Sequence, residues 1–182
     1  MKKTFLLLSI ALIVNVESVS SANFKKITLT NSIKNPKDSI RLAELDRYWA
    51  KLTKTVKEGD FEGFKSLYHS DAVVVFTYGK NKVSMPMKDV LPGWKKGFDE
   101  TKQGKQNDDV QFRFSQRIGN ENSAHETGIF VFTSKDLSGK IKTKLVLHFE
   151  MLLVKKNNNW YALMEYQKSE ASQEEWDALK QT

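Results

Sequence analysis

The chain has 182 residues, with 29 Lys and Arg, 22 Asp and Glu, and no cysteine. This length suits one globular domain, and the lack of cysteine excludes disulfides, thiol catalysis and cysteine-ligated metals. The formal net charge of +7 raises nucleic acid as a partner, but the lysines are scattered and interleaved with acids. We therefore predict no nucleic-acid binding.

Residues 1–22 are typical of a secretory signal peptide. Lys2 and Lys3 precede an apolar run from Phe5 to Val14, and the small residues Ser20 and Ala22 precede the predicted cleavage site. A membrane anchor is the alternative, but the run has about half of the ~20 residues that a membrane helix needs. We expect an exported protein, periplasmic or secreted, without membrane insertion after the signal is removed.

Residues 23–37 show no sustained period and are predicted to form a linker or arm, followed by a single domain over 38–182. Apolar residues then recur at spacings of three and four, which predicts an amphipathic helix over 38–58. Gly59 is the expected C-terminal cap. The stripe consists of Leu42, Leu45, Trp49, Leu52 and Val56.

Asp60 is suited to cap a second helix, because its carboxylate can accept from free backbone N–H groups in the first turn. His69 and Ser70 are assigned to the end of this helix, and Asp71 begins the strand "DAVVVFTY". The run His69-Ser70-Asp71 holds the residue types of a hydrolase triad. Sequence neighbours cannot adopt triad geometry, so we exclude this interpretation.

The remaining elements follow from turn signals and alternation. A turn at 79–82 leads to a short strand near 83–85 and to a third helix over 88–103. Short turns between long strands favour antiparallel hairpins, and Ser172 and Glu175 have the spacing of a capping box that opens a terminal helix. The long strands are predicted over 109–118, 123–134, 140–154 and 160–169.

Three stretches carry a resemblance to a known family: "VKEGDFEGFKSLYHSDAVVVF", "SAHETGIFVFT" and "FEMLLVKKNNNWYALMEYQKS". Over residues 40–170 the chain resembles the nuclear transport factor 2-like superfamily, in its bacterial SnoaL-like and ketosteroid-isomerase-like branches. The resemblance implies an α+β fold, with a cone-shaped, strongly curved antiparallel sheet wrapped around a long N-terminal helix. Because members include enzymes, binding domains and assembly domains, the fold does not choose among these functions.

Alternation along the strands predicts which side chains face the pocket. The odd positions of 145–153 are all apolar, which places them on the concave face and leaves His148 and Glu150 on the convex face. In the last strand the alternation is less clean, and we predict that Trp160, Ala162, Met164 and Tyr166 are concave.

In the ketosteroid-isomerase-like branch, the resemblance implies a carboxylate base at the position of Phe76 and an acidic partner near Glu150 or Met151. Alternation favours Met151 as the inward residue. Neither phenylalanine nor methionine can transfer a proton, so proton shuttling on a steroid is disfavoured.

The candidates for catalysis are His125, Glu126 and Tyr78. His125 and Glu126 are adjacent on a strand, so at most one of them can line the pocket. The predicted ligand-binding residues are mostly aromatic: Tyr48, Trp49, Phe76, Tyr78, Trp94, Phe98, Phe149, Met151, Met164 and Tyr166.

No metal and no cofactor are predicted. His148 and Glu150 share a face, but a catalytic zinc site needs a third protein ligand that no spacing supplies. The glycines do not have the spacing of a phosphate-binding loop.

Three functional hypotheses remain open. The leading one is binding of a small apolar or amphipathic molecule between the helices and the concave sheet. The alternatives are a cofactor-independent enzyme (a hydrolase, dehydratase or cyclase) and a non-catalytic assembly module. We also expect a homodimer through the convex face, which includes Val146, His148, Glu150 and Leu152.

Overall fold

The computed structural model describes residues 36–179, which lie within one compact unit, Ile33–Thr182. The predicted signal peptide, and the predicted linker up to residue 35, lie outside the described residues. Within the described range, no helix is both long enough and apolar enough to span a membrane.

All four predicted helices are present, although the second one ends earlier than predicted. The buried stripe of the first one includes Leu45, Trp49 and Leu52. Asp60 caps the second helix by accepting from Gly63 N at 2.9 Å, and the predicted capping box at Ser172 is present. The helices are α1 (Pro36–Glu58), α2 (Phe61–Lys65), α3 (Met87–Lys102) and α4 (Gln173–Ala178).

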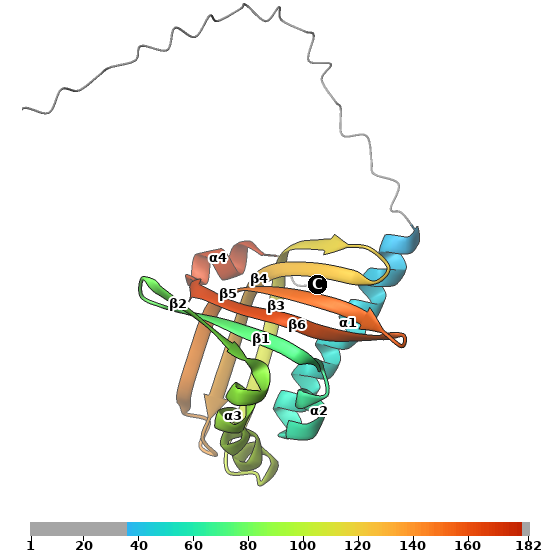
Figure 1. The fold of residues 1–182 in the computed structure, drawn as a ribbon. Coiled ribbons are helices and arrows are strands. Elements are labelled where there is room, and N and C mark those ends of the chain that lie inside the picture. The colour runs from blue at the N-terminus through green and yellow to red at the C-terminus, as the bar shows by residue number, and fades with distance from the viewer. Residues whose placement is uncertain (1–35, 180–182) are drawn as a thin grey trace, which may run out of the picture. The chain divides into compact units, whose positions relative to one another are not determined.

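Six strands form one sheet in the order β2-β1-β6-β5-β4-β3 (Figure 1). The meander of four long strands is antiparallel, as predicted. The strands are β1 (Tyr68–Tyr78), β2 (Asn81–Pro86), β3 (Asn107–Gly119), β4 (Ser123–Lys135), β5 (Ile141–Lys156) and β6 (Asn159–Glu170).

The sheet is mixed rather than wholly antiparallel, because β1 pairs with β6 in parallel. No hairpin joins these two strands. The chain passes through β2, α3 and the meander before β6 returns beside β1, and such a long crossover permits a parallel pairing.

The expectation that His69 and Ser70 end a helix is wrong. The second helix ends at Lys65, and β1 begins at Tyr68. Tyr68 pairs with Ala162 of β6, and Ala162 N donates to Leu67 O at 2.9 Å. Pairing with a strand almost a hundred residues later therefore extends β1 backwards, and no local pattern reveals such a partner.

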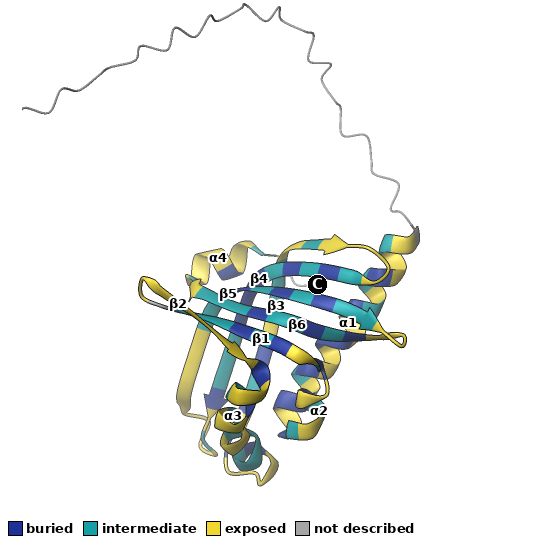
Figure 2. Cartoon of the chain, in the orientation of Figure 1, coloured by how far each residue is buried: buried dark blue, intermediate teal, exposed yellow. Residues whose placement is uncertain are grey.

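The sheet bends around the helices, so α1 and α3 face its concave side (Figure 1). Buried residues recur along α1, β1, β4, β5 and β6, whereas β2 is exposed throughout (Figure 2). The ring centroid of Trp49 lies 4.5 Å from that of Phe112 and 5.6 Å from that of Phe149. A Cβ added at Gly128 of β4 would lie only 2.0 Å from the carbonyl oxygen of Arg113, so this close approach of β3 and β4 requires glycine.

Alternation predicts the inward face of β5 correctly and that of β6 only in part. Phe149, Met151 and Leu153 are buried, as are Trp160 and Ala162. These residues form the part of the hydrophobic core that lies on β5 and on the first part of β6.

A register shift then reverses the alternation of β6. Leu153 pairs with Ala162, whereas Leu152 pairs with Met164, so one extra residue interrupts the ladder. Such a bulge exchanges the two faces of the strand beyond it. The prediction that Met164 and Tyr166 are concave is therefore wrong, and Glu165 faces inward instead.

The terminal helix α4 packs on the convex face. The guanidinium carbon of Arg113 lies 4.3 Å from the ring centroid of Trp176, and Nη1 of Arg113 donates to Trp176 O at 2.7 Å. Beside Arg113 in the sheet lies Ile129, which is only 2% exposed. His148, predicted to face a partner subunit, lies 3.3 Å from Glu175 of the same chain.

Candidate functional site

A cavity of about 530 Å³ lies between the helices and the concave face of the sheet. Leu52 and Val56 of α1 and several residues of α3 line its helical side. Most of the wall is apolar, as is usual for small-molecule pockets. Its aromatic wall includes Phe64, Trp94, Phe98, Phe112, Phe130 and Phe132.

Half of the predicted ligand-binding residues line this cavity. Phe76 comes from β1, Trp94 and Phe98 come from α3, and Phe149 and Met151 come from β5. Helix periodicity and strand alternation bring them together, because each element presents one apolar face to the same space.

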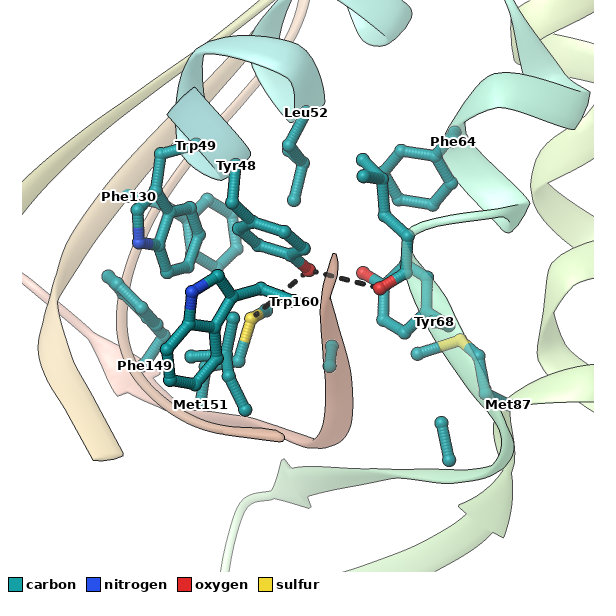
Figure 3. Close-up of a cluster of buried hydrophobic side chains, with 14 of the residues drawn as sticks. Tyr48, Trp49, Leu52, Phe64, Tyr68, Met87, Phe130, Phe149, Met151 and Trp160 are labelled. Carbon is teal, nitrogen blue, oxygen red and sulfur yellow. Dashed lines mark hydrogen bonds between the residues drawn. The ribbon is translucent and has the colours of Figure 1, made fainter. Parts of the chain in front are cut away.

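Other predicted residues lie elsewhere. Tyr48 and Trp49 are 5% exposed and belong to the core rather than to the cavity wall. The hydroxyl of Tyr48 donates to Leu67 O at 3.4 Å and lies 3.8 Å from Sδ of Met151 (Figure 3). Tyr166 lies beyond the bulge, on the convex side, where its hydroxyl accepts a hydrogen bond from Oγ1 of Thr77 at 3.2 Å. The side chain of Tyr78 is outside the described part of the chain.

A buried carboxyl that sequence analysis missed stands in the cavity wall. Glu165 is 8% exposed. The hydroxyl of Tyr68 donates to its Oε2 at 2.6 Å, and Nε2 of Gln167 donates to its Oε1 at 2.7 Å. Neither partner is a cation. Burial raises the pKa of the Glu165 carboxyl, and the hydrogen bonds from Gln167 and Tyr68 offset this only in part.

Glu165 and Gln167 belonged to the face of the last strand that alternation assigned to the convex side. Their polarity argued for solvent exposure, while the bulge that turns them inward has no sequence signature of its own. The one available signal was that the face assigned outward also carries the apolar residues Tyr161 and Leu163, so the alternation of this strand was weak.

A second cluster of polar side chains lies where α3 meets the beginning of β3. Nε2 of Gln106 donates to Oδ2 of Asp108 at 3.0 Å, and Nζ of Lys142 donates to Oε1 of Gln106 at 2.7 Å. Lys142 also lies 4.0 Å from Glu100. These residues line the same cavity, at the strand ends away from Glu165. The cavity thus has an apolar middle between two polar ends.

His125 and Glu126 point to opposite faces, as predicted, but neither lines the cavity. Glu126 is fully buried and accepts from Nε1 of Trp49 at 2.5 Å and from Nε of Arg117 at 2.8 Å. His125 lies 3.4 Å from Glu150. Glu126 is therefore held in an ion pair inside the core.

No group of three or more His, Cys, Asp or Glu side chains that could hold a metal ion occurs within residues 36–179. Glu150, considered with His148 as a metal ligand, instead accepts from Lys168 Nζ at 2.7 Å.

Solved structures of other proteins share this arrangement. A nuclear transport factor 2-like protein of unknown function from Shewanella oneidensis matches with a TM-score of 0.56 and 11% identity, over 71% of this chain and 99% of that one. A protein of unknown function from Mycobacterium tuberculosis matches with a TM-score of 0.54 and 14% identity, over 78% and 80%.

A ketosteroid isomerase-like protein from Erwinia carotovora atroseptica matches with a TM-score of 0.52 and 13% identity, over 72% of this chain and 97% of that one. The chain has a nuclear transport factor 2-like fold. At these identities the likeness concerns the fold alone. No protein-family model matches the chain, and no curated protein sequence does so.

Phe76 and Met151 occupy the positions where the resemblance to the ketosteroid-isomerase-like branch implied acidic groups. Both are apolar side chains that face the cavity. Phe76 lines it, and Met151 lines it at 2% exposure. Glu150 faces away, so the inward assignment of Met151 is confirmed. The acidic group of this cavity is Glu165, on a different strand.

Proposed function

We propose that the protein binds a small apolar or amphipathic molecule in this cavity. The observation that carries the proposal is a cavity of about 530 Å³ with aromatic walls and a few convergent polar groups, a combination typical of small-molecule sites. The fold adds support, because it presents the concave side of one bent sheet to such a site.

Glu165 and Gln167 would orient the bound molecule. A carboxyl with a raised pKa can donate or accept a hydrogen bond, and the amide of Gln167 adds a second donor and acceptor in the same wall. Apolar contacts would then contribute most of the affinity, at roughly 25 cal/mol per Å² of buried apolar surface.

A neutral dye tests this function. We expect N-phenyl-1-naphthylamine to bind saturably, at one molecule per chain, with enhanced fluorescence. Met151→Trp should weaken the binding at least tenfold because the larger side chain occupies the cavity. Val154→Trp is the matched control, since Val154 lies three residues further along β5 and does not line the cavity. Absence of saturable binding, or equal binding by both variants, would contradict the proposal.

A cofactor-independent enzyme is the second candidate, and the contact between Tyr68 and Glu165 favours it. A buried carboxyl with a raised pKa is suited to general acid–base catalysis. Glu165 replaces His125 and Glu126 as the proton-handling group. Once a substrate is known, Glu165→Gln, which keeps the size of the side chain but cannot exchange a proton, should abolish turnover; unchanged turnover would exclude Glu165 from this role.

Export and self-association are also proposals. The sequence of residues 1–22 supports export to the periplasm or the medium. The mass of the purified mature protein would test this, because cleavage after Ala22 would remove those residues. The convex residues Val146, Glu150 and Leu152 support a homodimer. Sedimentation velocity with Leu152→Glu, which should yield monomers, would test that interface.

A further inference from the structure

The cavity opens to solvent between α3 and the first residues of β5. Most of its wall is buried or half-buried, and the exposed residues of the wall are Gly93 and Lys96 of α3 and Lys142, Thr143 and Leu145 of β5. Leu145 is 42% exposed, whereas Phe149 on the same strand is 2% exposed. The wall therefore passes from the core to the surface along β5, and a molecule would enter the cavity at this end.

The hairpin turn beside this opening carries exposed apolar side chains. We call residues 135–145, which join β4 to β5, the rim hairpin. Residues 137–145 are all exposed (Figure 2), and Leu137 and Ile141 are 70% and 51% exposed. Single exposed apolar residues are common, but several on one turn mark a contact with a partner protein or a membrane.

The rim hairpin is also strongly basic. Its charged residues are one acid and four lysines: Asp136, Lys135, Lys140, Lys142 and Lys144. The Asp136 carboxylate is engaged inside the turn, where Oδ1 accepts from the backbone N–H groups of Ser138 and Lys140 at 2.9 and 3.0 Å. The hairpin therefore presents a positive charge to solvent.

Most of these lysines have no anionic partner in the molecule. Among residues 36–179, Lys135, Lys140 and Lys144 form no salt bridge, while Lys142 donates to Gln106 at the cavity edge at 2.7 Å. On the other side of the opening, lysines of α3 pair with acids of the same helix, as Lys95 does with Asp99 at 2.7 Å. The free positive charge thus lies on the rim hairpin.

Lysines and aliphatic side chains on one exposed turn favour an anionic lipid surface as the partner. Anionic headgroups attract each nearby lysine, and aliphatic side chains gain free energy by entering the boundary between headgroups and acyl chains. Nucleic acid is a poorer fit, because the rim hairpin has no aromatic side chain on which a base could stack, and its aliphatic side chains would gain nothing there.

We propose that the rim hairpin docks on an anionic lipid bilayer, with Leu137 in the headgroup region and the opening of the cavity against the membrane. The contact is peripheral, because the lysines bind headgroups and only the aliphatic tip leaves water. An apolar molecule can then pass between the bilayer and the cavity. Docking does not require a filled cavity, so this inference goes beyond the proposed binding function.

Vesicle flotation tests the docking. The protein used is residues 23–182, which contains the whole compact unit and lacks the apolar run 5–14, since that run would itself bind lipid. We expect at least about tenfold tighter binding to phosphatidylcholine vesicles with about one third phosphatidylglycerol than to phosphatidylcholine alone, because each lysine near an anionic surface contributes roughly fivefold in affinity.

Two double variants locate the attraction. Lys140→Gln combined with Lys144→Gln should weaken binding to the anionic vesicles at least about tenfold. Lys51→Gln combined with Lys156→Gln is the matched control. It removes the same charge from two other exposed lysines, one on α1 and one at the far end of β5, and should change the affinity by less than about threefold.

A fluorescent label tests the apolar contact. The chain has no cysteine, so Leu137→Cys supplies a single site for a nitrobenzoxadiazole label, whose emission rises when it leaves water. The emission should rise with anionic vesicles and stay constant with phosphatidylcholine vesicles. Asn122→Cys, in the exposed turn at the other end of β4, is the matched control and should not respond.

The outcomes that overturn the proposal are distinct. Equal affinity for the two kinds of vesicle would exclude an anionic bilayer as the partner. Equal losses in the two double variants would assign the attraction to the net charge of the protein, and an unresponsive label at residue 137 would exclude the proposed orientation. Failure of the dye to bind would remove the proposed binding function but not the docking, because vesicle binding is measured without the dye.

Discussion

Two buried glutamates, Glu126 and Glu165, lie in one row of the sheet, and Met151 of β5 separates them. Glu126 is paired with the Arg117 cation and does not line the cavity. Glu165 is bonded to neutral partners and does line it. Burial of a carboxyl therefore does not by itself identify a functional site; the charge of its partners and its access to empty space distinguish the two residues.

The physical consequences of the two environments differ. A buried ion pair compensates its own desolvation, and loss of one partner leaves the other charge buried alone. A carboxyl without a cationic partner responds to burial by holding its proton, so the pKa of Glu165 is raised. The first arrangement stabilises the fold, and the second keeps a proton available in a cavity.

The largest effect is expected at Glu126. Glu126→Ala leaves Arg117 and the indole N–H of Trp49 without their buried acceptor, so we expect a loss of about 3–5 kcal/mol in the free energy of unfolding, measured in urea. Glu121→Ala, on an exposed turn, should change it by less than ~0.5 kcal/mol. Arg117→Ala combined with Glu126→Ala should cost less than the sum of the single changes. Additive losses would contradict a coupled pair.

A smaller effect is expected at Tyr68. Tyr68→Phe removes the donor to Oε2 of Glu165 and leaves that oxygen unpaired in the wall, at a cost of about 1–3 kcal/mol. Tyr161→Phe is the control on β6, because the hydroxyl of Tyr161 makes no hydrogen bond within the described residues. Equal urea midpoints for the two variants would show that the short contact at Tyr68 contributes nothing to stability.

The smallest change in stability is expected for Glu165→Gln, and its size depends on pH. The raised pKa means that the folded state holds the proton more tightly than the unfolded state. Tighter proton binding in the folded state stabilises the protein fully below pH 4.5, the ordinary pKa of the group. This contribution to the free energy of unfolding is lost as the pH rises through the raised pKa of the folded state. The variant should match the wild type below pH 4.5 and become the more stable protein as pH rises. A difference that does not vary with pH would contradict the raised pKa.

Local periodicity determined much of this protein. The stripe of α1, the capping residues Asp60 and Ser172, and the hairpins of the meander were all predicted, because each depends on residues near one another in the chain. The inward face of β5, with Phe149 and Met151, followed from simple alternation. Half of the predicted ligand-binding residues reach the cavity wall for this reason.

Only the tertiary structure decided which polar groups face the cavity. The bulge in β6 that turns Glu165 inward and Tyr166 outward depends on pairing with β5, and the start of β1 depends on Ala162 of β6. The opposite roles of Glu126 and Glu165 depend on Arg117 and Tyr68, which other strands supply. Alternation in the sequence indicates which residues of a strand share a face. Pairing between distant strands decides where a bulge exchanges the two faces and which partner each buried carboxyl contacts.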